Sequence, residues 1–184
     1  MVEIGVKIAP VAVSAADLKL GSGPVEGTGV RLSHAETKAR YSLRARDAAV
    51  LDGVLGRKLP AKIGDTADGI ACLGPDEWYA LLPEGTTLPK GEGLPVSVVD
   101  VSSRALGFVL EGPGALAVLS SGCPLDLAKL AVGRATRTVF ETVEIVVWRE
   151  AEDRWHVEVW RSFAIWLWHA FLAAMHSSGG HAAK

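Results

Sequence analysis

The chain has 184 residues, of which 49% are apolar and 22% are charged. This length is typical of one domain and allows a hydrophobic core that needs neither a disulfide nor a structural metal. Lys and Arg number 19 and Asp and Glu 21, so the formal net charge of -2 gives no indication of a nucleic-acid or membrane partner. The unusual feature of this composition is its six tryptophans, which outnumber either of the other aromatic residues, with four phenylalanines and two tyrosines.

The cysteines and the hydropathy pattern exclude several classes of protein. Cys72 and Cys123 have apolar neighbours and no nearby second cysteine, so we expect buried thiols and neither a zinc site nor a disulfide. The first residues lack the basic start and apolar stretch of a signal peptide. The longest apolar run, residues 163–175, is shorter than the roughly 20 residues that cross a bilayer. We therefore expect a soluble, cytoplasmic protein.

The two ends of the chain differ in composition from its middle. Residues 1–34 are an N-terminal extension that is partly loop, because Gly, Pro and Val are frequent there and residues 21–27 have the composition of a loop. Residues 177–184 contain only Ser, Gly, His, Ala and Lys, which predicts a flexible tail. Residues 35–176 form the predicted domain.

The first half of this domain predicts a strand, a helix and a hairpin in that order. Residues 38–45 alternate as a half-buried strand does. A helix follows from an N-cap at Asp47 to Gly56, with apolar side chains at helical spacing between them. After a proline-containing connection, residues 69–73 and 78–82 predict two strands joined by a tight turn.

The same order recurs in the second half. Pro113 lies near the first turn of the second helix, and Gly122 ends that helix. A final helix is expected over residues 162–176. The second helix itself is predicted over residues 115–121. Strands are predicted before it over residues 96–101 and 105–110, and after it over residues 138–148 and 155–160. The sequence therefore predicts an α+β fold of two related halves, each a small antiparallel or mixed sheet with a packed helix.

The residues predict no catalytic or ligand-binding motif. The glycines of residues 21–27 lack the spacing of a dinucleotide fingerprint, and Ser102 and Ser103 lack the turn of a hydrolase nucleophile. Asp76 and Glu77 are interpreted as a solvated hairpin turn. No two histidines have the spacing of metal ligands, and the histidine of the last hairpin is expected to face solvent. The five histidines are His34, His156, His169, His176 and His181.

Apolar side chains surround the final helix, whereas a surface helix of a small domain has a single apolar stripe. The helix lies either between two layers of its own domain or with one face docked onto another protein, because Trp and Met are enriched in interface cores. The face expected to cover the sheet carries Phe163, Trp166, Leu167, Ala170 and Phe171. The opposite face, which a monomer would expose, carries Ile165, Trp168, Leu172 and Met175.

Arg161 lies at the junction between the last strand and this helix, and a positive charge at a helix N-terminus is unfavourable for the helix dipole. We therefore expect Arg161 to have a carboxylate partner. Asp100, which precedes Ser102 and Arg104 in the sequence, is one candidate for it. Asp100, Arg104 and Arg161 form the predicted structural polar cluster.

Six short motifs occur in order along residues 35–176, and together they resemble the gamma subunit of heterotetrameric sarcosine oxidase. Each motif is weak alone, but their order and spacing make the resemblance specific. The motifs are CLGPDEW at residues 72–78, VDVSSR at 99–104, EGPGA at 111–115, GCPLDL at 122–127, RT at 137–138 and RSFA at 161–164.

The resemblance implies a fold like the folate-binding domain of aminomethyltransferases, which is internally duplicated. It also implies a complex that oxidatively demethylates sarcosine to glycine, with tetrahydrofolate as the one-carbon acceptor and hydrogen peroxide as a product. Alpha, beta and delta subunits would be the partners. FAD, FMN and NAD would belong to the larger subunits and zinc to delta, while this chain would hold no cofactor, metal or catalytic residue.

We accordingly predict a non-catalytic assembly subunit, without nucleic-acid or membrane partners. The alternatives are a stand-alone folate-binding protein or aminomethyltransferase-like enzyme that uses the cleft between the halves, and a stand-alone domain of shared ancestry. Five of the six tryptophans lie on the last hairpin and helix. The predicted subunit interface consists of Trp148, Trp155, Trp160, Ile165, Trp168, Leu172 and Met175.

Overall fold

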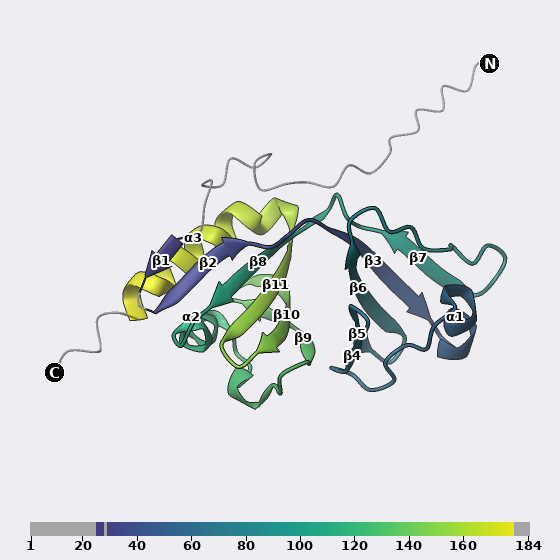
Figure 1. Ribbon diagram of the computed structural model, residues 1–184, viewed down its shortest axis with the longest axis horizontal. Coiled ribbons are helices and arrows are strands. Elements are labelled where there is room, and N and C mark those ends of the chain that lie inside the picture. The colour runs from purple at the N-terminus through teal and green to yellow at the C-terminus, as the bar shows by residue number, and fades with distance from the viewer. Residues whose placement is uncertain (1–24, 28, 179–184) are drawn as a thin grey trace, which may run out of the picture.

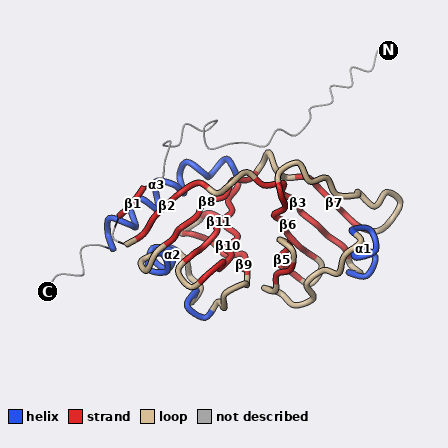
Figure 2. The backbone as a smooth tube through the Cα atoms, viewed as in Figure 1, coloured by secondary structure: helices blue, strands red, loops and turns tan. Residues whose placement is uncertain are grey.

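Two antiparallel sheets lie side by side, with helices on their outer faces (Figures 1 and 2). A computed structural model describes residues 25–27 and 29–178. The six-stranded sheet has the order β1-β2-β8-β11-β10-β9. In that order its strands are Val25–Gly27, Val30–His34, Ala105–Glu111, Arg154–Trp160, Val143–Ala151 and Ala135–Phe140.

The second sheet has five strands in the order β4-β5-β6-β3-β7. In that order they are Thr66–Ala67, Ile70–Gly74, Glu77–Pro83, Lys38–Ala45 and Val96–Asp100. Helix α1 (Ala48–Leu55) belongs to this half, and helices α2 (Ala115–Gly122) and α3 (Arg161–Ser178) belong to the six-stranded half. A short 3-10 helix, η2 (Leu127–Lys129), follows α2.

The predicted internal duplication is confirmed by the topology. The order β4-β5-β6-β3 in one sheet corresponds to β9-β10-β11-β8 in the other. In chain order the first strand of each set is followed by a helix: α1 follows β3, and α2 follows β8. The strand that precedes each set lies in the opposite sheet: β2 leads into β3 but pairs with β8, and β7 leads into β8 but pairs with β3. Each half therefore completes the sheet of the other.

The core has three parts, because both faces of the sheets are covered. One cluster lies between the six-stranded sheet and helices α2 and α3, and a second lies between the other sheet and α1. A third joins the two sheets and contains Tyr79, Val146 and Trp148. Along β10 the two-residue period sends Ile145 and Val147 to the helices and Val146 and Trp148 to the other sheet.

Helix α1 has the bounds that its caps predict. The Asp47 side chain accepts a hydrogen bond from the Ala49 N–H at 2.9 Å. Gly56 ends the helix with a φ of 62°, a left-handed conformation that glycine adopts without strain. Leu51 and Leu55 are buried against the five-stranded sheet.

Helix α3 packs on β2, β8, β11 and α2. Leu167 and Phe171 are buried as predicted, but the buried face is rotated relative to the predicted one, because Phe163 and Trp166 are exposed. Its buried residues are Ala164, Leu167, Trp168, Phe171 and Met175, at the spacing of one helical stripe. Trp168 is 3% exposed and stacks on His34 at 4.4 Å, whereas Trp166 is 39% exposed. Apolar residues occur all round this helix, so its hydropathy pattern does not determine which side packs on the sheet. The direct continuation of β11 into α3 sets the rotation instead.

Two further predictions require correction. Residues 138–148 form two strands, β9 and β10, because the chain turns at Glu141, which has a φ of 52° and no glycine to signal it. Of the loop predicted over residues 21–27, Val25–Gly27 form β1 and residues 21–24 lie outside the described residues.

The ends of the chain also differ from the prediction. Within the predicted extension, β1 and β2 join the six-stranded sheet. Ser177 and Ser178 continue α3, and the rest of the predicted tail, residues 179–184, lies outside the described residues. Within residues 25–27 and 29–178, no helix combines the length and hydropathy needed to cross a membrane.

Trp166 and Trp168, two positions apart, test the orientation of α3. We expect Trp168→Ala to lower the free energy of unfolding by about 3–5 kcal/mol, because the substitution leaves a cavity in the core. Trp166→Ala removes an exposed ring and is expected to cost less than about 1 kcal/mol. Urea unfolding of both variants followed by circular dichroism measures the difference. The reverse order would restore the faces predicted from the sequence.

Candidate functional site

A buried ion pair joins the two sheets at the centre of the seam between them. Arg40 on β3 and Glu158 on β11 are each 2% exposed. Arg40 donates from Nε to Glu158 Oε2 at 2.5 Å and from Nη2 to Glu158 Oε1 at 2.9 Å. Its third nitrogen donates to the Lys38 carbonyl at 3.0 Å. This two-bond geometry is the strongest that arginine forms with a carboxylate.

Two more side chains bind the same carboxylate. The Tyr79 hydroxyl on β6 donates to Glu158 Oε2 at 3.2 Å, and His156 Nε2 lies 2.7 Å from Glu158 Oε1. An ionised carboxylate only accepts, so His156 donates through Nε2. The prediction that His156 faces solvent is therefore wrong: it is buried, because β11 is covered by helices on one face and by the second sheet on the other.

The backbone leaves room for this cluster at Gly107 on β8. A Cβ atom at Gly107 would lie 2.6 Å from Glu158 Oε1 and 2.9 Å from His156 Nε2. Ser102, in the link between β7 and β8, accepts a hydrogen bond from the Arg40 N–H at 2.9 Å. The link in which the chain passes from β7 to β8 is therefore bound to the strand that carries Arg40.

The partners of Glu158 keep its carboxylate ionised. Burial by itself raises the pKa of Glu158, but the hydrogen bond from His156 and the charge and hydrogen bonds of Arg40 outweigh burial and lower the pKa to about 2. Burial and the adjacent Glu158 charge raise the pKa of Tyr79 well above its usual value, so its hydroxyl stays protonated. A carboxylate held by three partners serves as a structural tie and is not free to act as a base.

A second set of ion pairs crosses the seam at its outer part. Arg137 on β9 binds both carboxylate oxygens of Glu77 on β6, and Arg44 approaches Glu77 at 3.1 Å. Burial raises the pKa of Glu77, but Arg137 and then Arg44 lower it below its usual value. Close by, Arg134 pairs with Asp65 at 2.5 Å. Glu77 is therefore a seam residue and not part of a solvated turn.

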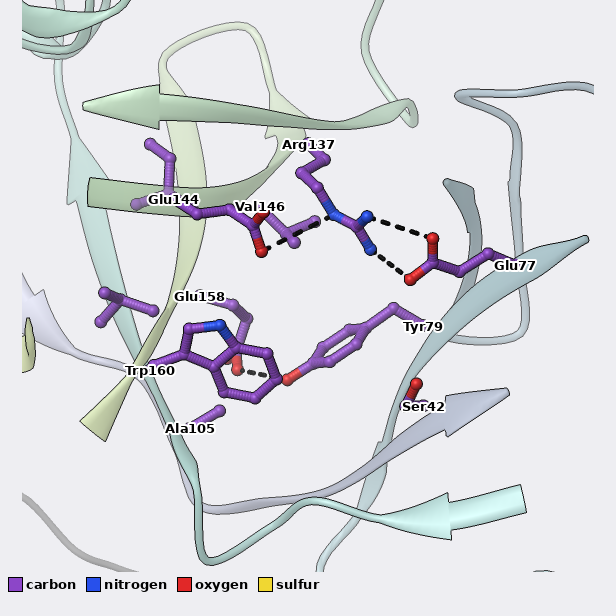
Figure 3. Close-up of a pocket in the computed structure, with 11 residues that line it drawn as sticks. Ser42, Glu77, Tyr79, Ala105, Arg137, Glu144, Val146, Glu158 and Trp160 are labelled. Carbon is purple, nitrogen blue, oxygen red and sulfur yellow. Dashed lines mark hydrogen bonds and ion pairs between the residues drawn. The ribbon is translucent and has the colours of Figure 1, made fainter. Parts of the chain in front are cut away.

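A small cleft lies between the two sets of ion pairs (Figure 3). Its volume is about 50 Å³, and its lining includes Tyr79, Arg137, Glu144, Glu158 and Trp160. Pockets for drug-sized ligands and cofactors have volumes of about 300–1,000 Å³. This cleft is well below that range, and the cross-sheet side chains Arg137, Tyr79 and Glu158 line it.

The described residues offer no ready metal site. Among residues 25–27 and 29–178, no group of three or more His, Cys, Asp or Glu side chains is arranged to hold a metal ion. Cys72 and Cys123 are buried and free, as the sequence predicts. The Cys72 thiol donates to the Gly74 carbonyl at 3.3 Å, and Cys123 contacts the Thr138 hydroxyl at 3.4 Å.

Most of the residues predicted for the subunit interface lie inside the chain. Trp148 fills the space between the sheets, where its ring meets that of Tyr79 at 5.9 Å. Trp155, Trp168 and Met175 belong to the core beneath α3. These four residues are not available at the surface, because the sheets and helices of this chain already cover them. Trp160 and Leu172 are half-buried and Ile165 is exposed, so for these three the prediction still stands untested.

The predicted polar cluster is adjacent in space but is not joined by ion pairs. Asp100 accepts a hydrogen bond from the Ser102 N–H at 2.8 Å and so stabilises the link between β7 and β8. The Arg104 guanidinium lies over the Trp160 ring at 5.1 Å, and the Arg161 N–H donates to the Arg104 carbonyl at 2.7 Å. Over the described part of the chain, neither arginine pairs with Asp100, because that carboxylate is turned to its own loop.

The seam residues were missed by sequence reasoning, although a signal was present. Arg40 lies between Ala39 and Tyr41, and Glu158 lies between Val157 and Val159, in the middle of strands β3 and β11. Charges that are buried in this way are almost always paired. That pattern indicates a buried partner for each of them. It does not identify the partner, which lies 118 positions away.

Removing the charge of Glu158 tests whether its ion pair with Arg40 stabilises the fold. We expect Glu158→Gln to lower the free energy of unfolding by about 3–5 kcal/mol, because Arg40 is left as an unpaired buried charge. Glu111→Gln is the control, since its ion pair with Arg154 is exposed and is worth less than about 1 kcal/mol. Urea unfolding measures both. Equal losses for the two variants would contradict a structural role for the pair.

The lowered pKa of Glu158 also predicts how stability depends on pH. Because the folded-state pKa, about 2, lies below the unfolded value of 4.5, this group stabilises the fold above the unfolded pKa, and the contribution is lost as pH falls toward 2. We expect the free energy of unfolding to decrease between about pH 5 and pH 2, with a shallower decrease in Glu158→Gln. Urea titrations at several pH values compare the slopes, and parallel slopes would refute the assignment.

Comparison with known proteins places this geometry in a family. Residues 42–176 match the family model described as "Sarcosine oxidase, gamma subunit family". A sarcosine oxidase subunit gamma from Arthrobacter sp is 38% identical over 122 residues, which cover 59% of this chain and 60% of the relative. The same subunit from Corynebacterium sp. (strain P-1) is 34% identical over 140 residues, covering 69% of this chain and 68% of the relative.

Solved structures agree with the sequence matches. A chain of heterotetrameric sarcosine oxidase from Corynebacterium sp. U-96, solved in complex with pyrrole 2-carboxylate, is similar with a TM-score of 0.73 and 30% identity, over 84% of this chain and 87% of that one. The aminomethyltransferase T of the glycine cleavage system from Bartonella henselae has a TM-score of 0.62 at 16% identity, over 79% of this chain and 46% of that one, and shows the shared fold alone. The chain belongs to the sarcosine oxidase gamma subunit family.

Proposed function

We propose that this chain is a non-catalytic assembly subunit of a heterotetrameric sarcosine oxidase. In the reaction proposed for the complex, sarcosine is demethylated to glycine, its one-carbon unit passes to tetrahydrofolate, and the two electrons removed reduce oxygen to hydrogen peroxide. The partners are alpha, beta and delta subunits. They hold the FAD, FMN, NAD and zinc, and this chain holds none of these groups.

The observation that carries the proposal is that the polar side chains between the two sheets bind one another. In a fold built of two related halves, a cleft between the halves is the natural place for a ligand. In this chain the polar groups at that place bind one another: Arg40 and Tyr79 with Glu158, and Arg137 with Glu77. This arrangement supports a rigid structural part without its own active site. Membership of the gamma subunit family supports the oxidase as the complex in which it serves.

A stand-alone folate-binding or aminomethyltransferase-like protein is the alternative. The likeness to an aminomethyltransferase covers 46% of that chain and extends to the fold only. The cleft of about 50 Å³ is too small for a folate molecule without rearrangement of the seam. We therefore favour assembly over folate binding.

Co-expression tests the proposal. We expect this chain to co-elute with the alpha, beta and delta subunits of its source organism in size-exclusion chromatography, and the complex to form hydrogen peroxide when sarcosine is added. The chain alone is expected to form no peroxide and to give no calorimetric signal with tetrahydrofolate. Elution apart from the other subunits would overturn the proposal, and tight tetrahydrofolate binding by the isolated chain would favour the alternative.

A further inference from the structure

Large apolar side chains are exposed together at the start of α3. Phe163 is 46% exposed, Ile165 is 47% exposed and Trp166 is 39% exposed, all within four positions of one helix. The other large apolar side chains exposed in the described part of the chain lie on separate loops or on the edge strand β7. Single exposed apolar residues need no explanation, but a contiguous group indicates an interaction site.

Phe163 and Ile165 border an open groove of about 700 Å³. Ser103 and Arg104, in the link between β7 and β8, form one side, and residues 160–163 with Ile165 form the other. The groove is held in shape by its own contacts. Arg104 covers the Trp160 ring at 5.1 Å, and the Arg161 N–H donates to the Arg104 carbonyl at 2.7 Å. A partner would therefore meet a surface that is already formed.

The charge of this surface has one sign. No Asp or Glu occurs in residues 159–184, and no acidic residue lines the groove. Across the described residues, neither Arg104 nor Arg161 forms an ion pair. Arg161 occupies the first turn of α3, where a positive charge is unfavourable unless a carboxylate is near. The carboxylate that this position requires is thus not supplied by the described part of the chain.

We propose that this groove, formed by Arg104, Trp160, Arg161, Phe163 and Ile165, is the docking surface for a segment of a larger oxidase subunit that carries an apolar side chain flanked by carboxylates. The inference rests on the proposed function and adds to it the place and the chemistry of the contact. The apolar side chain of the partner is buried against Phe163 and Ile165, which supplies affinity. The carboxylates pair with the two arginines, which fixes orientation and speeds association.

Single substitutions in the co-expressed complex test this surface. We expect Arg161→Glu and Ile165→Asp each to weaken binding to the alpha, beta and delta subunits at least about tenfold, because each places a negative charge against the carboxylates or removes apolar contact. Binding of the unchanged chain is expected to weaken as ionic strength rises, and Arg161→Glu is expected to lose that dependence. The readouts are pull-down yield and a titration of affinity.

Matched controls carry the same changes elsewhere. Arg57→Glu reverses an exposed charge after α1, and Leu125→Asp replaces an exposed leucine after α2, and both are expected to bind as the unchanged chain does. Circular dichroism checks the fold of every variant, and Phe163→Ser is a milder second variant if Ile165→Asp unfolds. If the unchanged chain and both groove variants bind equally, the groove is refuted and the proposed function stands. If the unchanged chain does not bind, both proposals fail.

Discussion

The ion pair between Arg40 and Glu158 is the constraint on which the rest of the structure depends. Two sheets that bury their shared faces must satisfy every polar group placed between them. Here one carboxylate accepts from an arginine and a tyrosine of one sheet and from a histidine of its own strand. The side chains that make these contacts also line the cleft between the sheets, whose volume is about 50 Å³. The attachment of the two sheets to each other and the small size of this cleft therefore have one physical origin.

Local signals explain why part of the fold is predictable from sequence. The caps at Asp47 and Gly56, the hairpin turn at Pro75 and the repeated order of elements depend on neighbours in the chain, so α1, β5, β6 and the duplication follow directly. Non-local contacts explain the remainder. A two-residue period shows that His156 and Glu158 share a face of β11, but only the second sheet shows that this face is buried.

The tryptophan excess illustrates the same limit. Composition and position indicate that these rings matter, but they do not separate a core role from an interface role. The chain covers Trp148, Trp155 and Trp168 itself and leaves Trp166 exposed and Trp160 half-buried. Trp166 and Trp168 are only two positions apart, and they differ in exposure because of the rotation of α3, which is set by its continuation from β11. When a helix is apolar on all sides, its sequence pattern does not predict which side is buried.

The exchange of β2 and β7 between the sheets has a consequence for how the protein folds. Neither half is a separable domain, because removing one half would take β2 or β7 away from the sheet of the other half and leave that half's own leading strand unpaired. The geometry is that of a domain-swapped dimer whose two copies have been joined into one chain. In such a molecule both halves unfold together. A partner that binds one half at the N-terminus of α3 therefore stabilises the folded state of the whole subunit.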